Sequence, residues 1–318
     1  MGETVGSLGE FGLIAAVTAR LPSGPDVIVG PGDDAAVVSF ADGRTVASTD
    51  VLVEGRHFRL DWSSALDVGH KAAAASLADV AAMGARATAL LVGLGIPPDL
   101  PAQWALELAD GIRAECELVG AVVVGGDVVR SDRIVVSVTA LGTLDGREPV
   151  LRSGAAVGDT VALAGRLGHA AAGLTVLSRG FRSPRKLADA HRRPSPPYDA
   201  GPLAAEAGAT SMIDVSDGLV ADLTHVALAS GVVVLIESAL LPVGDSLIDA
   251  AAAFTLDPLT WVLTGGEDHA LAATFAADAA LPGGFVRIGS VVERGDETAH
   301  VLVDGRPYVG SAGHDHFR

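Results

Sequence analysis

Carboxylate side chains recur at five places where a predicted strand gives way to a turn of small residues. The five segments are Gly32-Asp33-Asp34, Ser48-Thr49-Asp50, Gly125-Gly126-Asp127, Asp214-Val215-Ser216-Asp217-Gly218 and Gly265-Gly266-Glu267-Asp268. A further acid, Asp79, lies outside these segments, inside a predicted helix. Carboxylates crowded together repel one another unless cations neutralise them, and Mg²⁺ takes such hard oxygen ligands while keeping part of its water. The neighbouring glycines allow a phosphate to approach the backbone, so the pattern predicts magnesium ions bound together with a polyphosphate.

Each segment taken alone has a plainer interpretation. A Gly-Asp pair is ordinary turn chemistry, and Asp217-Gly218 is also compatible with a helix cap. Asp79 is equally compatible with an ion pair to Lys71 or Arg86. The recurrence of the pattern favours the metal site. The sequence has no EF-hand loop, no phosphate-binding Gly-x-x-x-x-Gly-Lys-Ser/Thr loop, no Gly-x-Ser-x-Gly elbow, no protein-kinase motif set and no His-Glu-x-x-His.

Composition excludes several classes of partner and site. The formal net charge is -17, with 22 Lys+Arg against 39 Asp+Glu, and such a field repels nucleic acid and anionic membranes. The single cysteine, Cys116, excludes an internal disulfide and a thiolate zinc cluster. No signal peptide and no membrane span is predicted, so we expect a cytoplasmic protein.

The elements expected to position these acids alternate between helices and strands. Predicted helices cover 10–21, 65–83, 101–119, 168–178, 219–230 and 246–253. Predicted strands cover 26–29, 35–39, 45–48, 88–96, 121–124, 134–144, 160–164, 211–215, 232–237 and 261–263. The stretch 179–202, rich in Arg, Pro and Ser, is predicted to be a surface excursion. We interpret the chain as two α/β (α+β) domains, residues 1–145 and 146–318, without a classical dinucleotide-binding fold.

As an ordered set, the motifs resemble those of the thiamine-monophosphate kinase family. The similarity runs from Glu10-Phe11-x-Leu13-Ile14 to Asp315-His316-Phe317 and includes all the acidic segments above, Leu52-Val53-Glu54-Gly55-x-His57-Phe58 and Leu151-Arg152-Ser153-Gly154. It implies a two-domain fold of the aminoimidazole-ribonucleotide-synthetase type, a homodimer joined through ATP- and magnesium-binding N-terminal domains, and a C-terminal domain that completes the active site. It also implies Mg²⁺-dependent, direct in-line transfer of the ATP γ-phosphoryl group to thiamine monophosphate.

The resemblance assigns roles to positions that match the family motifs. Magnesium ions would be held by Asp34, Ser48, Thr49, Asp50, Asp79, Asp127, Asp214 and Asp217, and Asp50, Asp127 and Asp217 would be catalytic. ATP would contact Gly126, Asp127, Arg152 and Ser216. Thiamine monophosphate would contact His57, Glu267, His314 and Phe317. The number of metal ions, and whether K⁺ assists, are left open by the sequence.

Three positions depart from the family pattern. Val128-Val129 replaces two threonines, His269-Ala270 replaces Tyr-Glu, and His314 stands where an aromatic ring is expected to stack on thiamine, with Phe317 or Tyr308 as substitutes. The alternative function is another ATP-using synthetase of the same fold, of the aminoimidazole-ribonucleotide type. Selenophosphate synthetase and the hydrogenase-maturation dehydratase would need a cysteine near one terminus, which this chain lacks. A nucleotide-binding regulator is the non-enzyme alternative, and the intact aspartate set argues against it.

Overall fold

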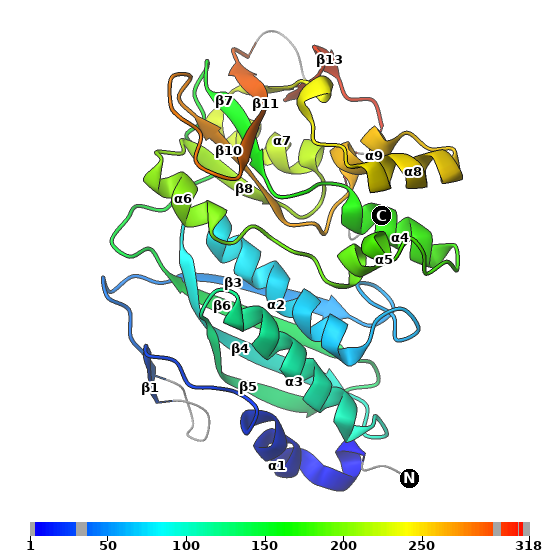
Figure 1. Ribbon diagram of the computed structural model, residues 1–318. Helices are drawn as coiled ribbons and strands as arrows, with labels where there is room; N and C mark the ends of the chain where they lie inside the picture. The colour runs from blue at the N-terminus through cyan, green and yellow to red at the C-terminus, as the bar shows by residue number, and fades with distance from the viewer. Residues whose placement is uncertain (1–3, 30–36, 295–299, 311, 314–318) are drawn as a thin grey trace. The chain divides into compact units, whose positions relative to one another are not determined.

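The computed structural model describes residues 4–29, 37–294, 300–310 and 312–313. The chain divides into two compact units, one of residues 1–80 and 85–146 and the other of residues 81–84 and 147–318. Each unit is a sheet with helices against it, which confirms the two-domain α/β class predicted from the sequence (Figure 1).

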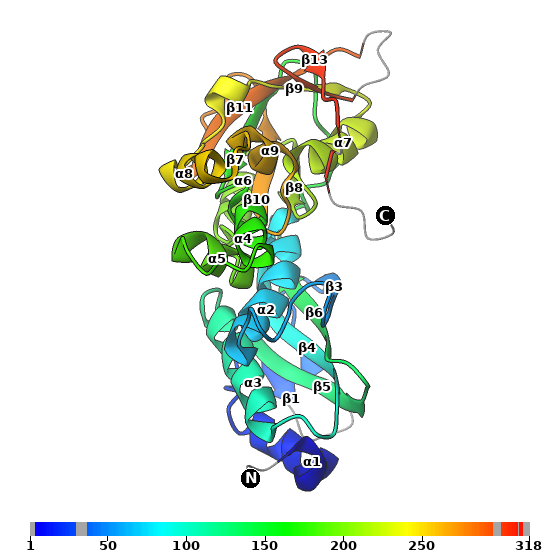
Figure 2. The same cartoon turned by 90° about the vertical axis from the view of Figure 1, so that its right-hand side faces the viewer.

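The first unit contains one four-stranded sheet, a small hairpin and three helices. Its elements are α1 (Val5–Thr18), β1 (Val27–Val29), β2 (Val37–Val38), β3 (Val46–Val53), α2 (Ala65–Ala82), β4 (Arg86–Ile96), α3 (Ala102–Glu117), β5 (Val122–Arg130) and β6 (Val135–Thr143). The strand order is β3-β6-β4-β5, with only β4 and β5 parallel, and the hairpin β1-β2 forms a separate sheet. Figures 1 and 2 show α2 and α3 lying along the same face of the four-stranded sheet.

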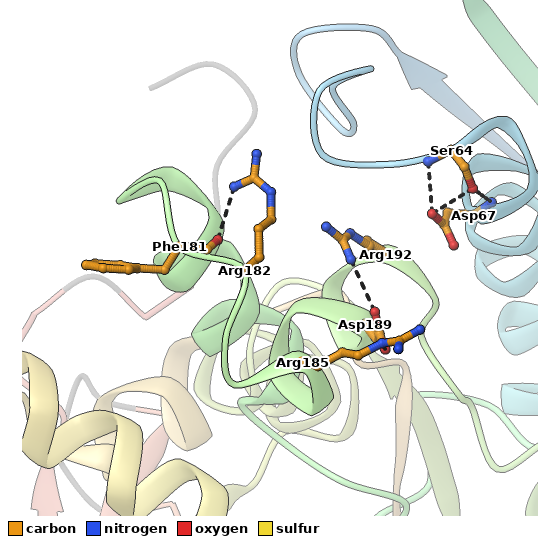
Figure 3. Close-up of polar contacts among 7 residues, drawn as sticks. All are labelled: Ser64, Asp67, Phe181, Arg182, Arg185, Asp189 and Arg192. Atoms are coloured by element: carbon orange, nitrogen blue, oxygen red, sulfur yellow. Dashed lines mark hydrogen bonds and ion pairs between the residues drawn. The ribbon is translucent and has the colours of Figure 1, made fainter.

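Small residues set the spacing of α2 and α3. A Cβ on Gly69 would lie 2.2 Å from the Leu108 carbonyl oxygen, and one on Gly111 would lie 2.2 Å from that of Leu66. The two helix backbones therefore cross in near contact, as glycine alone permits. Ser64 begins α2: its hydroxyl accepts the Asp67 N–H at 3.2 Å while the Asp67 carboxylate accepts the Ser64 N–H at 2.9 Å (Figure 3).

The second unit is built on a seven-stranded sheet. Its elements are β7 (Thr160–Ala164), α4 (His169–Ser178), α5 (Arg185–Arg192), α6 (Ala200–Glu206), β8 (Ser211–Val215), α7 (Leu219–Ser230), β9 (Val233–Ile236), η1 (Ser238–Leu240), α8 (Asp245–Phe254), α9 (Pro258–Thr264), β10 (Ala270–Phe275), β11 (Phe285–Val292), β12 (Val301–Val303) and β13 (Arg306–Pro307). The strand order is β13-β12-β9-β11-β7-β10-β8. Alternate residues along β7 and β8 enter two separate apolar cores, one including α7 and α9 and the other including α6.

Two predictions about the second unit are wrong. Residues 261–263, predicted as a strand, lie in helix α9, because the Asp257 side chain accepts the Leu259 N–H and Pro258 occupies the first helical turn. The stretch 179–202 is not a surface excursion throughout: it contains α5 and the start of α6, and Leu187, Ala188 and His191 are buried. Alternation of charged and small apolar residues forms an amphipathic helix there, which the overall polarity of the segment concealed.

No single helix in the described part of the chain is long and apolar enough to cross a bilayer. Helices α8 and α9 are long and apolar enough for a membrane span only when they are counted as one segment, and the two are bent by 116° relative to each other.

Candidate functional site

Ser48 and Asp50 lie inside strand β3 and face helix α2. The prediction that the strand ends at Ser48 is wrong, since β3 continues to Val53 and pairs with β6 along its whole length. The Ser76 hydroxyl donates to Asp50 Oδ2 at 2.8 Å and to the Val138 carbonyl at 3.0 Å. The Ser48 hydroxyl donates to the Asp79 carboxylate. Three predicted metal ligands from two elements are thus brought together, and Ser76 is a member that the sequence analysis missed.

The spacing between Ser76 and Asp79 in the sequence indicates that Ser76 belongs to this group. Residues three apart share one face of a helix, so a serine three positions before a candidate ligand is placed to contact the same group. The Lys71 ammonium donates to the His57 carbonyl at 3.0 Å, and Arg86 pairs with Asp145 at 3.3 Å.

Thr49 points away from α2, because successive side chains of a strand alternate between faces. Its hydroxyl accepts a hydrogen bond from Thr139 at 3.0 Å and donates to the Val138 carbonyl at 3.2 Å. Thr49 is therefore not grouped with Ser48 and Asp50 in this structure.

Gly126 and Asp127 also lie within a strand, since β5 extends from Val122 to Arg130 rather than ending at residue 124. A Cβ on Gly126 would lie 2.0 Å from the Val92 carbonyl oxygen, so the sheet itself requires this glycine. Asp127 is exposed and lines a hollow of 370 Å³ together with Gly93 and Ser137.

The register places Asp127 and Asp50 on opposite faces of the sheet. Asp50 is paired with Val138, which is paired with Val92, which is paired with Gly126. Paired residues of neighbouring strands share a face, so Asp127, one residue further, faces the other way. Within the first unit the predicted ligands form a helix-side group around Asp50 and a separate exposed carboxylate at Asp127.

His57 is held in one orientation in the loop after β3. Its Nδ1 accepts the Val53 backbone N–H at 2.9 Å, and its carbonyl accepts the buried Lys71 ammonium. Because Nδ1 acts as an acceptor, the ring proton of the neutral imidazole is on Nε2, and that nitrogen is a hydrogen-bond donor.

In the second unit, the segment after α9 runs beside the end of β8. The Glu267 N–H donates to the Ser216 carbonyl at 2.8 Å, and the His269 N–H donates to that of Val215 at 3.1 Å. His269 Nδ1 lies 3.0 Å from Asp214 Oδ2, and both side chains are buried. The predicted ligand Asp214 therefore has one carboxylate oxygen engaged by a residue that departs from the family motif.

The turn that carries Ser216 and Asp217 is held by Asp222. Its Oδ2 accepts the N–H groups of Asp217 at 3.1 Å and of Gly218 at 3.0 Å. Burial raises the pKa of Asp222 to about 7, partly opposed by these hydrogen bonds. Gly218 is the N-cap residue of α7, as the cap interpretation of Asp217-Gly218 allows, and the cap has no side-chain hydrogen bond. Asp222 was missed, although its place one helical turn beyond a Ser-Asp-Gly turn was a signal.

Asp268 ties the Gly265–Asp268 segment to helix α4. Both of its carboxylate oxygens lie 3.1 Å from the Ala170 N–H, and Arg166 Nε lies 3.6 Å from Oδ1. Burial raises the pKa of Asp268 to about 6, against the opposing effects of the Ala170 hydrogen bond and the Arg166 charge. The Gly265–Asp268 segment follows helix α9 rather than a strand. Asp217 therefore lies just after a strand, β8, as predicted, whereas Glu267 does not.

Arg152, predicted to contact ATP, is exposed on a loop that Ser230 fixes. The Ser230 hydroxyl oxygen accepts the N–H groups of Gly154 and Ala155, each at 3.1 Å, and donates to the Arg152 carbonyl at 3.1 Å. Sequence reasoning did not find Ser230, which lies 78 residues away in the chain.

Three predicted site residues, Asp34, His314 and Phe317, lie outside the described residues. Tyr308, a substitute for the stacking ring, packs against the larger apolar core of the second unit. Across the described ranges, no three His, Cys, Asp or Glu side chains are grouped closely enough to hold a metal ion on their own. Among the described predicted ligands, Asp50 and Asp79 lie beside hydroxyl groups, whereas Asp214 lies beside His269.

Two family models match the chain in succession. The model described as AIR synthase related protein, N-terminal domain, covers residues 32–144, and that described as AIR synthase related protein, C-terminal domain, covers residues 156–302. The thiamine-monophosphate kinase of Mycobacterium tuberculosis strain H37Rv is 50% identical over 315 residues, which is 99% of this chain and 93% of that protein. The chain belongs to the thiamine-monophosphate kinase family. The family predicted from the ordered motifs is thereby confirmed.

Solved structures of other members of this enzyme family share the fold. The thiamine-monophosphate kinase of Stenotrophomonas maltophilia K279a superposes with a TM-score of 0.81 at 31% identity, covering 93% of this chain and 96% of that one. AaThiL complexed with AMPPCP and TMP gives a TM-score of 0.79 at 34% identity and covers 97% of both chains.

Proposed function

We propose that this protein transfers the γ-phosphoryl group of ATP directly to thiamine monophosphate, giving thiamine diphosphate and ADP in a Mg²⁺-dependent, in-line reaction. The observation that carries the proposal is the 50% identity, across 99% of the chain, to a protein named thiamine-monophosphate kinase. The related AaThiL structure, which contains the ATP analogue AMPPCP together with TMP, supports the pair of substrates.

The donor set in the first unit suits Mg²⁺. Asp50 and Asp79 provide carboxylate oxygens and Ser48 a hydroxyl, all hard ligands, and Mg²⁺ is usually bound by one or two carboxylates plus waters and substrate phosphates. Bound there, Mg²⁺ would neutralise phosphate charge that a protein of net charge -17 otherwise repels. The remaining predicted ligands are Asp34, Thr49, Asp127, Asp214 and Asp217.

The protein's own contribution is orientation and charge placement. The Ser76 and Ser48 hydroxyls restrict the Asp50 and Asp79 carboxylates to single arrangements. The Nε2–H of His57 supplies a donor for the anionic acceptor. The attacking phosphate oxygen is already ionised at neutral pH, so the reaction requires alignment rather than a strong general base.

An ADP-release assay tests the proposed activity. We expect turnover with thiamine monophosphate and none with thiamine or with aminoimidazole ribonucleotide precursors. EDTA should abolish turnover and Mg²⁺ restore it, and exchange of Na⁺ for K⁺ reports any role of potassium. Turnover with the aminoimidazole precursor instead would assign the alternative function.

Stereochemistry tests the direct mechanism. With ATP that is chiral at the γ-phosphorus, a single in-line transfer inverts the configuration, whereas a phosphoenzyme produces overall retention.

Asp50→Asn should lower kcat by about 100-fold or more, because it removes a charge that the proposed mechanism uses to hold Mg²⁺. It should leave the melting temperature within ~3 °C, because Asp50 is only half-buried. A near-wild-type rate would contradict the role of Asp50.

We also propose that the first unit forms a homodimer through the sheet face opposite α2. Val51, Leu91 and Val129 on that face are 48%, 38% and 53% exposed, so they present apolar surface beside the Asp127 hollow. Leu91→Glu should convert a dimer to a monomer in light scattering. Its matched control, Leu118→Glu on an exposed position after α3, should leave the mass unchanged.

A further inference from the structure

Helix α5 separates its charged residues from its buried ones. Arg185 and Arg192 both pair with Asp189 at 3.2 Å, and the Arg185 and Asp189 side chains are 89% and 46% exposed (Figure 3). Leu187 and His191 are only 0% and 4% exposed. His191 is therefore a buried polar residue on the side of α5 that packs into the unit, a position that calls for a specific partner.

That partner is Glu267. His191 Nδ1 lies 3.2 Å from Glu267 Oε2, and the Glu267 side chain remains 33% exposed. One oxygen of the carboxylate thus faces a buried imidazole while the group as a whole still reaches solvent. Glu267 also has a positive φ of 67°, a left-handed conformation that residues other than glycine seldom adopt.

Both sides of this contact are built on close packing. A Cβ on Gly173 of α4 would lie 2.0 Å from the Leu187 carbonyl oxygen and 2.9 Å from the His191 Cβ, so glycine brings α5 directly against α4. A Cβ on Gly266 would lie 2.1 Å from the Ser216 carbonyl oxygen, and Asp268 ties the same segment to α4. The separation of His191 and Glu267 is therefore fixed by backbone contacts within one unit.

We propose that His191 is a positioning residue that holds the Glu267 carboxylate in the orientation that binds the acceptor. The inference rests on the proposed function, in which Glu267 contacts thiamine monophosphate. A glutamate on a loop samples several rotamers, and ordering it costs free energy each time a ligand binds. A buried imidazole that fixes the carboxylate beforehand lowers that cost for thiamine monophosphate alone, since the proposed function assigns Glu267 to thiamine monophosphate and not to ATP.

Steady-state kinetics of three variants test the proposal. His191→Phe fills the space but removes the ring nitrogen that faces the Glu267 carboxylate, and we expect KM for thiamine monophosphate to rise roughly tenfold while KM for ATP stays within about twofold. His191→Asn keeps a donor near the Nδ1 position and should restore KM to within about threefold of wild type. The control Arg185→Gln, on the outer side of the same helix, should change neither constant.

A double-mutant cycle separates positioning from a general structural role. In a Glu267→Gln background, His191→Phe should add less than about twofold to KM, because the group it orients is already altered. An undiminished tenfold effect in that background, or equal changes in both KM values, would overturn the proposal. If wild type does not phosphorylate thiamine monophosphate, the proposed function fails; if it does and His191→Phe is normal, only the present inference fails.

A measurement without turnover covers the case in which His191→Phe does not fold. The imidazole ¹⁵N resonances of His191, assigned by comparison with His191→Asn, should shift when Glu267 is changed to Gln and when thiamine monophosphate is added to wild type. Resonances unchanged by both perturbations would overturn the proposal.

Discussion

Asp222 provides a quantitative test of how the turn bearing Ser216 and Asp217 is held. The carboxylate is 3% exposed and accepts two backbone N–H groups, and burial raises its pKa from 3.8 to about 7. Since the folded-state pKa lies above the unfolded one, the folded protein retains a proton that the unfolded chain has lost between about pH 4 and pH 7. The contribution of Asp222 to stability therefore falls as pH rises through that window and is lowest above pH 7.

Asp222→Asn should remove this pH dependence while keeping an oxygen that can accept both N–H groups. Because the pKa of Asp222 rises from 3.8 to about 7 on folding, its contribution to the unfolding free energy is about 4 kcal/mol lower above pH 7 than at low pH, and less than half of that decrease has occurred at pH 5. We therefore expect the unfolding free energy of Asp222→Asn, relative to wild type, to increase by roughly 2–3 kcal/mol between pH 5 and pH 8. Any fixed cost of burying the amide NH₂ cancels in that difference.

Urea unfolding in EDTA at several pH values measures the effect. Of the three tryptophans, Trp261 lies buried in α9 of the second unit, so a Trp62→Phe/Trp104→Phe background restricts fluorescence to that unit. Asp222→Ala is the comparison: it leaves two N–H groups without their acceptor, which costs about 1–3 kcal/mol each, so it should be less stable than Asp222→Asn at every pH. Parallel pH curves for wild type and Asp222→Asn would refute the reasoning.

Three further predictions concern packing and reactivity. Gly173→Ala forces α5 away from α4, because its Cβ would lie 2.0 Å from the Leu187 carbonyl oxygen, so calorimetry should show a melting temperature lower by about 5 °C or more. Ser230→Ala removes the acceptor of the Gly154 N–H and frees the loop that carries Arg152, so KM for ATP should rise several-fold in ADP-release assays while KM for the acceptor is unchanged. The pKa of the buried Cys116 thiol is raised to about 12, so a colourimetric thiol reagent at pH 8 should label it only after urea is added, and labelling of the folded protein would contradict its burial.

Elements with a strong period were predicted well from the sequence. Helix α7 and strands β7 and β8 have the predicted limits, and the predicted helix at 65–83 differs from α2 by one residue. These segments combine a clear apolar pattern with an unambiguous stop such as Gly231, which has a positive φ of 71°. The family and its fold also followed from the order of the motifs.

The predictions failed where polar residues lie inside regular structure. Ser48, Asp50 and Asp127 were interpreted as following strands, yet β3 and β5 continue through them, because neighbouring strands satisfy the backbone whatever the side chain. A single sequence shows the polarity of such residues but not the register that supplies their hydrogen bonds. Consequently the pattern identified candidate ligands but not that Asp50 and Asp127 face opposite sides of one sheet.

The acidic residues of the second unit divide into two kinds that composition does not distinguish. Asp222 and Asp268 are almost fully buried, have raised pKa values and bond to backbone N–H groups next to the predicted site residues Asp217 and Glu267. Their role is to fix the loops. Asp217 and Glu267 keep some exposure, so solvent and ligands can reach them. Replacement of a buried acid by its amide should therefore alter stability more than metal affinity, whereas the same replacement at Asp217 should do the reverse.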